Sequence, residues 1–110
     1  MPRRLCFALD LSDDPQLIAE YEAHHAPGAV WPRVIEHIRA QGFDAMEIWR
    51  TGTRLVMIAE VADNYPRPVP EPPEIEKWED LMWRFQRALP DAQAGEKWVA
   101  MRRIFDLDEQ

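Results

Sequence analysis

The first hydrophobic pattern in the chain is a strict alternation near its start. Four large apolar residues are separated by single residues, and they are Leu5, Phe7, Leu9 and Leu11. A period of two is typical of a strand with one apolar face. The pattern therefore predicts a strand over about residues 4–11.

The spacing then changes to that of helices. Residues 12–15 read Ser-Asp-Asp-Pro, which offers capping oxygens and a proline suited to a first helical turn. Leu17, Ile18 and Tyr21 form an apolar stripe, so we expect a helix that runs to about His25. A second helix is predicted over 31–41, with Gly42 as its stop.

Two strands should follow, over 43–50 and 54–61, because both segments are rich in strand-forming residues. The short link between them contains a glycine, which favours an antiparallel hairpin. The next segment, 63–73, holds five of the ten prolines. It is predicted to be extended, either as a disordered linker or as a loop packed over a site or a subunit interface.

A third helix is predicted over 74–89, where apolar residues recur at helical spacing before Pro90. Alternation over 98–107 predicts a final strand. The resulting order is typical of an α+β fold, an antiparallel sheet with helices on one face. The other face needs a cover, so we expect a homodimer in which two sheets pack face to face.

Composition narrows the class of protein. A chain of 110 residues is predicted to be a single domain, 1–110, and its formal net charge of −7 argues against nucleic-acid binding. Cys6 is the only cysteine, and no apolar run is long enough for a signal peptide or a membrane span. These features predict a cytoplasmic protein without a membrane partner.

Candidate chemistry centres on Tyr21 and His25, which are four residues apart and share one face of the predicted helix. A phenol and an imidazole so placed can exchange protons near neutral pH. The alternative is structural, because a histidine at a helix end is often solvated and Tyr21 fits a core position. Trp78, Trp83 and Trp98 are likewise typical packing residues, although aromatic faces also suit sugar rings.

Other chemistries find little support. His24 and His25 are adjacent and therefore point about 100° apart on a helix, and no paired Cys or His spacing typical of a metal site occurs. The chain also lacks a nucleophile elbow, a phosphate loop and a dinucleotide fingerprint. A metal site is therefore poorly supported.

The chain resembles the L-rhamnose mutarotase family in a series of motifs that runs in order along nearly its whole length. The most specific is the tyrosine-to-histidine segment followed by Trp-Pro. The motifs are Tyr21-x-x-x-His25-x-Pro27, Val30-Trp31-Pro32, the Gly42 turn, 54–60, Leu89-Pro90 and 104–107.

The resemblance implies a dimeric, ferredoxin-like fold of the α/β barrel type. It also implies interconversion of the α and β anomers of a 6-deoxy-L-hexose without a metal or an organic cofactor. It implies His25 as the general acid/base and Tyr21 as a sugar-binding residue. Met46 stands where a second tyrosine is expected, and Trp78 and Trp83 stand in place of a paired tryptophan. We expect all three to bind substrate.

Segments 46–52, 81–84 and 95–98 are similar to a branch of the family associated with L-fucose, so the sugar is predicted to be L-fucose or L-rhamnose. Two alternatives come from other classes. One is a cofactor-independent monooxygenase of the same dimeric fold, and the other is a regulatory module that binds a sugar without turning it over.

Overall fold

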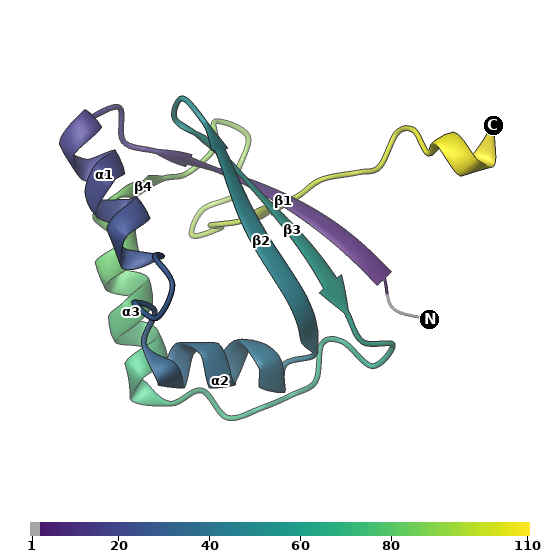
Figure 1. Cartoon of the computed structure of the whole chain (residues 1–110), viewed down its shortest axis with the longest axis horizontal. Coiled ribbons are helices and arrows are strands. Elements are labelled where there is room, and N and C mark those ends of the chain that lie inside the picture. The colour runs from purple at the N-terminus through teal and green to yellow at the C-terminus, as the bar shows by residue number, and fades with distance from the viewer. Residues whose placement is uncertain (1–2) are drawn as a thin grey trace.

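The computed structural model describes residues 3–110 and shows a curled antiparallel sheet with three helices on one side of it (Figure 1). The three long strands are β1 (Arg3–Leu11), β2 (Phe43–Thr51) and β3 (Arg54–Val61). Two short strands, β4 (Gln86–Arg87) and β5 (Val99–Ala100), complete the sheet. The three predicted long strands are confirmed.

The strand order is β2-β3-β1-β4, with β5 also paired to β1. All pairings are antiparallel, and the β2–β3 hairpin closes with Thr51 opposite Arg54. In the β1–β3 pair, Asp10 lies opposite Arg54, and these two side chains form an ion pair. This order, with helices between β1 and β2 and between β3 and β4, is the ferredoxin-like arrangement that the sequence predicts.

The helices begin as their sequences indicate. In α1 (Pro15–His24), the Asp14 carboxylate accepts hydrogen bonds from two backbone N–H groups of the first turn. Both α2 (Pro32–Ala40) and α3 (Pro73–Trp83) begin with a proline, which lacks the N–H that a first turn would leave unpaired. No helix among the described residues is long and apolar enough to cross a membrane.

The core lies between the sheet and the helices. Strand β3 buries every second residue on this side, namely Leu55, Met57, Ala59 and Val61. Leu9 of β1 is fully buried, and Phe85, just after α3, is 1% exposed.

Helix α3 is shorter than predicted, since it ends at Trp83 and not near Leu89. The chain then turns so that Phe85 enters the core, and its carbonyl accepts a hydrogen bond from the Ser12 N–H. Strand β4 follows at once on the edge of β1. Burial of Phe85 and pairing with β1 therefore override the helical periodicity of this segment.

The predicted final strand over 98–107 is also wrong for most of its length. Only Val99 and Ala100 pair with β1, and the chain then leaves the sheet until a short 3-10 helix at Leu107–Glu109. This tail extends away from the rest of the molecule (Figure 1). Beyond the hydrogen bond from the Met101 N–H to the Cys6 carbonyl, the tail pairs with no strand of residues 3–110, although the adjoining edge of β1 continues to Arg3.

The proline-rich segment is extended and lies against the end of α2. The Arg67 N–H donates to the Gln41 carbonyl at 2.9 Å, and the Tyr65 ring lies 4.9 Å from that of Phe43. Gly42 has a φ of 113°, and a Cβ on it would come within 3.3 Å of Tyr65. The segment is thus a packed loop and not a linker.

Candidate active site

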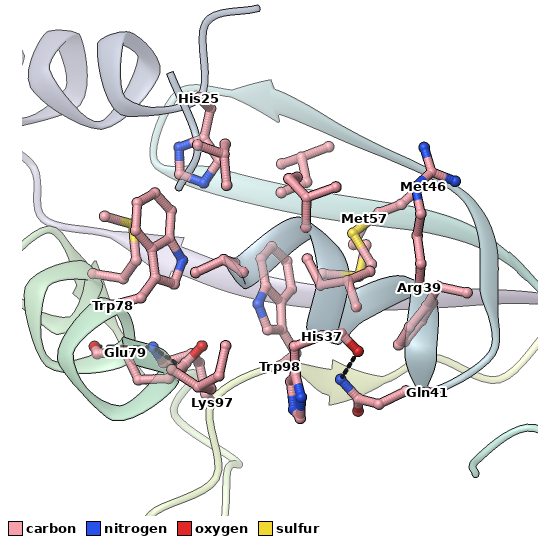
Figure 2. Close-up of a pocket in the computed structure, with 18 of the residues that line it drawn as sticks. His25, His37, Arg39, Gln41, Met46, Met57, Trp78, Glu79, Lys97 and Trp98 are labelled. Carbon is pink, nitrogen blue, oxygen red and sulfur yellow. Dashed lines mark hydrogen bonds and ion pairs between the residues drawn. The ribbon is translucent and has the colours of Figure 1, made fainter. Parts of the chain in front are cut away.

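A cavity of about 640 Å³ lies between the helices and the sheet, a size suited to a small organic ligand. Helices α1, α2 and α3, strands β2, β3 and β4, and the segment before β5 all contribute to its wall (Figure 2). Apolar side chains form much of the lining, including Val34, Ile38, Ile48 and Met57. A few polar groups project among them, as in sites that orient a mostly neutral ligand.

His25 lines this cavity from the C-terminal end of α1. Its Nδ1 lies 2.8 Å from the carbonyl oxygen of Tyr21, which can only accept, so Nδ1 carries a proton. In the neutral ring, Nε2 then holds a lone pair. The ring centroid lies 4.3 Å from that of Tyr21 and 5.7 Å from that of Trp78, so two aromatic neighbours fix its orientation.

Burial lowers the pKa of His25 below its ordinary value of 6.5. The hydrogen bond to the Tyr21 carbonyl acts in the opposite direction, and the nearby His24 lowers the pKa further. The net shift favours the neutral ring at pH 7. His25 is therefore in the form that can accept a proton at Nε2.

Tyr21 is 3% exposed, and burial raises the pKa of its phenol to about 12. The phenol is consequently protonated at neutral pH and serves as a hydrogen-bond donor. Its oxygen accepts a bond of 3.3 Å from Nε2 of Gln86. Gln86 is also buried and lines the cavity, and its Oε1 has no hydrogen-bond partner among residues 3–110.

The structure brings four of the five predicted site residues together at the cavity, namely Tyr21, His25, Met46 and Trp78. Trp83 is not part of this lining. Its ring instead lies 4.6 Å from the ammonium group of Lys97.

The rings of His24 and His25 both lie near Trp78. The His24 ring lies 6.3 Å from that of Trp78 and 5.4 Å from that of Phe85, so it also approaches α3. Only His25 of the two lines the cavity.

Several cavity residues are not predicted by local sequence patterns, because they come from distant parts of the chain. Gln86 lies on β4, Glu79 on α3, and Lys97 and Trp98 just before β5. No local spacing links them to Tyr21 or His25. Within residues 3–110, no group of three His, Cys, Asp or Glu side chains is arranged to hold a metal ion.

The lowered pKa of His25 leads to a prediction about pH. If Nε2 of His25 accepts a proton in a catalysed step, the rate of that step should stay level from about pH 8 to 6.5 and fall only below that, as Nε2 becomes protonated. The measurement is the logarithm of the catalysed rate against pH, after the rate without protein has been subtracted. An acid inflection above 6.5 would contradict a base of lowered pKa.

Comparison with known proteins gives matches over nearly the whole chain. A family model described as L-rhamnose mutarotase matches residues 4–107. An L-fucose mutarotase of Xanthomonas campestris pv. campestris is 46% identical over 112 residues, which cover 97% of this chain and 90% of that protein. A UPF0734 protein of Dictyostelium discoideum is 36% identical over 110 residues, covering 92% and 86% of the two chains.

Among solved structures, an L-rhamnose mutarotase from Formosa agariphila matches with a TM-score of 0.70. The match covers 96% of this chain and 98% of that one at 18% sequence identity. At this level of identity the similarity supports the fold alone.

Proposed function

Because the chain belongs to the L-rhamnose mutarotase family, we propose that it interconverts the α and β anomers of a 6-deoxy-L-hexose, with His25 as the acid/base group. The family is one of sugar mutarotases, so the chain is an enzyme of the isomerase type. The observation that carries the proposed role is the position of His25 at the cavity wall, where Nδ1 lies 2.8 Å from the Tyr21 carbonyl oxygen and Nε2 is left to act on a ligand.

The reaction requires two proton movements. Nε2 of His25 takes the proton from the anomeric hydroxyl while the bond between the anomeric carbon and the ring oxygen breaks. The imidazolium of His25 then gives this proton to the ring oxygen, so that the neutral imidazole is regenerated and an open-chain aldehyde results. Rotation about the first carbon–carbon bond and the reverse transfers close the ring on the other face of the carbonyl.

Tyr21 supports this chemistry as a donor. Its raised pKa keeps the phenol protonated, and Gln86 occupies the oxygen as a donor, so the phenol hydrogen is directed to another acceptor. A sugar oxygen in the cavity is a suitable acceptor. Fixing one sugar oxygen in this way lowers the entropic cost of reaching the reactive geometry.

The sugar that we favour is L-fucose. The relative that is 46% identical is an L-fucose mutarotase, whereas the matching L-rhamnose mutarotase structure is only 18% identical. Met46 and Met57 line the cavity and offer apolar contact to the methyl group of a 6-deoxy sugar. Proton NMR saturation transfer on both sugars tests this choice: faster exchange of L-rhamnose than of L-fucose would overturn it.

We also propose that two chains associate through the side of the sheet that the helices leave open. On β3, the residues between the buried ones, including Val56 and Ile58, face this side. On β2, Trp49 is 61% exposed. Apolar side chains on the tail are exposed as well, namely Met101, Ile104, Phe105 and Leu107.

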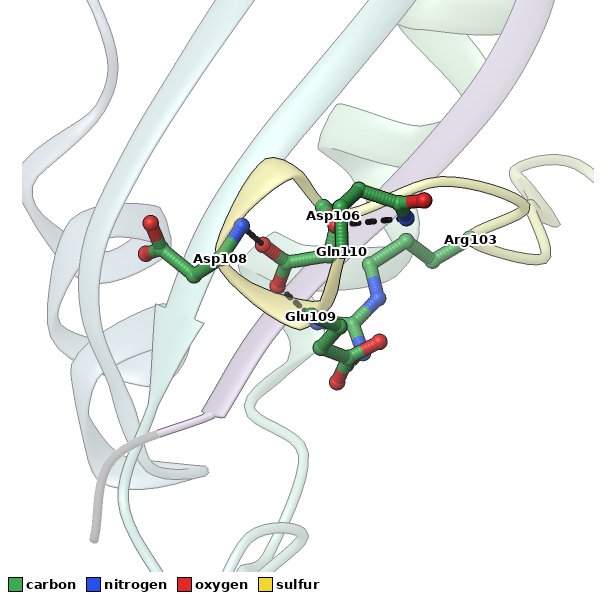
Figure 3. Close-up of polar contacts among 5 residues, drawn as sticks. All are labelled: Arg103, Asp106, Asp108, Glu109 and Gln110. Carbon is green, nitrogen blue, oxygen red and sulfur yellow. Dashed lines mark hydrogen bonds and ion pairs between the residues drawn. The ribbon is translucent and has the colours of Figure 1, made fainter.

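The end of the tail is held in shape by its own polar contacts (Figure 3). Arg103 forms ion pairs of 2.9 Å with Asp106 and with Glu109, and the Asp108 N–H donates to the Asp106 carboxylate. This order leaves Phe105 62% exposed. Packing such residues against a second copy would remove them from water.

We expect light scattering to give the mass of two chains for the wild type. Phe105→Glu should shift the mass toward one chain, because a charge would have to be buried at the contact. Gln16→Glu, which adds the same charge on the exposed first turn of α1, should leave two chains. A wild-type mass of one chain would refute the dimer.

A further inference from the structure

One ion pair in the cavity wall differs from the others in the molecule. The Lys97 ammonium lies 2.5 Å from the Glu79 carboxylate, and both residues line the cavity. The Lys97 side chain is only 11% exposed, whereas the arginines in the other ion pairs of the described residues are at least 36% exposed. The Glu79 side chain is 46% exposed, so the ammonium is the desolvated member of the pair, and leaving it unpaired would be costly.

Three contacts hold the Lys97 ammonium in place. Besides the Glu79 carboxylate, it donates to the Glu79 backbone carbonyl at 3.4 Å. Its nitrogen also lies 4.6 Å from the ring centroid of Trp83, a cation–π distance. The group is therefore preorganised, although Lys97 belongs to the irregular segment before β5.

The pair lies on another part of the wall from His25. In Figure 2, His25 lies on one side of Trp78, and Glu79 and Lys97 lie together on the other side, next to Trp98. The charge of Glu79 contributes to the raised pKa of Tyr21, so the carboxylate is also close enough to act on that phenol.

The Lys97–Glu79 pair can still form hydrogen bonds with a ligand. An ammonium has three N–H donors, and the Glu79 carboxylate and carbonyl account for two of them. The Trp83 ring attracts the positive charge but offers no oxygen or nitrogen acceptor, so one N–H can still donate to a ligand. The second oxygen of the carboxylate can accept. A donor and an acceptor therefore stand side by side, the arrangement that neighbouring hydroxyl groups require.

We propose that the Lys97–Glu79 pair binds a ring hydroxyl of the sugar away from the anomeric carbon and determines which epimer the cavity accepts. This inference rests on the proposed function. Trp83 is then a positioning residue, which acts by holding the ammonium and not by touching the sugar.

The test compares L-fucose with its 2-deoxy, 3-deoxy and 4-deoxy analogues. For each sugar, anomer exchange by NMR gives the ratio of kcat/KM between wild type and Lys97→Met, a variant that keeps an apolar stem of similar length. We expect a loss of about ten-fold or more for L-fucose, the usual effect of removing a charged hydrogen-bond partner. The loss should appear mainly in KM.

The loss should disappear for one deoxy analogue, because that sugar lacks the hydroxyl that Lys97 binds. Glu79→Gln should also lose kcat/KM for the sugars that carry this hydroxyl and not for the analogue that lacks it. Trp83→Leu should show the same pattern with smaller losses. Arg33→Met, which removes an exposed ion pair between α2 and α3 outside the cavity, should leave all four sugars unaffected. It controls for the general loss of a charge.

An equal loss for all four sugars in both Lys97→Met and Glu79→Gln would overturn the inference, because it would show that the pair only holds the chain in shape. That result leaves wild-type exchange of L-fucose intact. It therefore differs from failure of the proposed function, in which wild-type protein would accelerate no exchange.

Discussion

Replacing His25 with alanine is expected to lower the catalysed exchange of sugar anomers by roughly 10²- to 10⁴-fold, the usual contribution of a general acid/base group. The imidazole is held by the Tyr21 carbonyl at 2.8 Å and by two aromatic rings, and alanine keeps none of these contacts and no group that transfers protons. The measurement is saturation transfer between the α and β anomeric proton signals of L-fucose.

The matched control is His24→Ala. His24 has the same side chain one residue earlier, but it does not line the cavity, so its loss should change the rate by only a few-fold through Trp78 and Phe85. Far-UV circular dichroism should show both variants folded. Equal rate losses in the two variants would show that the catalytic role is assigned to the wrong residue.

Phe85→Ala should lower the free energy of unfolding by about 3–5 kcal/mol, the usual cost of truncating a buried phenylalanine. Phe85 is 1% exposed, and it packs edge-on against Tyr21 with 6.2 Å between the ring centroids. Removing the ring leaves a cavity where the chain passes from α3 to β4. Urea unfolding followed by tryptophan fluorescence measures the loss.

Ile35→Ala is the control for this core position. Ile35 is 39% exposed on α2, so its truncation should cost about 1 kcal/mol. A loss for Phe85→Ala no larger than that for Ile35→Ala would contradict the core as described. It would also remove the explanation for the early end of α3.

Local patterns in the sequence predict most of the sheet and the start of every helix. Alternation finds β1, and the glycine link locates the β2–β3 hairpin, because both signals depend on residues close in the chain. Tyr21 and His25 are predicted together for the same reason: a spacing of four residues on α1 places them side by side.

The early end of α3 has a nonlocal cause. Helical spacing continues past Trp83, but Phe85 is drawn into a core formed by β1 and β3. Alternation near the C-terminus predicts a strand that the tail does not form, since the chain leaves the edge of β1 after Met101.

The polar part of the cavity is similarly nonlocal. Glu79 and Lys97 are brought together from segments 18 residues apart, and Gln86 meets Tyr21 across 65 residues. Trp83, which the resemblance places among the substrate-binding residues, lies outside the cavity lining, and its ring contacts the Lys97 ammonium.

The most direct test of the proposed activity is saturation transfer between the anomeric protons of L-fucose at neutral pH, with protein present in catalytic amounts. We expect the exchange rate to rise in proportion to protein concentration and the equilibrium ratio of anomers to stay unchanged. L-Fucose that binds, as shown by quenching of tryptophan fluorescence, without faster exchange would contradict catalysis and indicate a sugar-binding module.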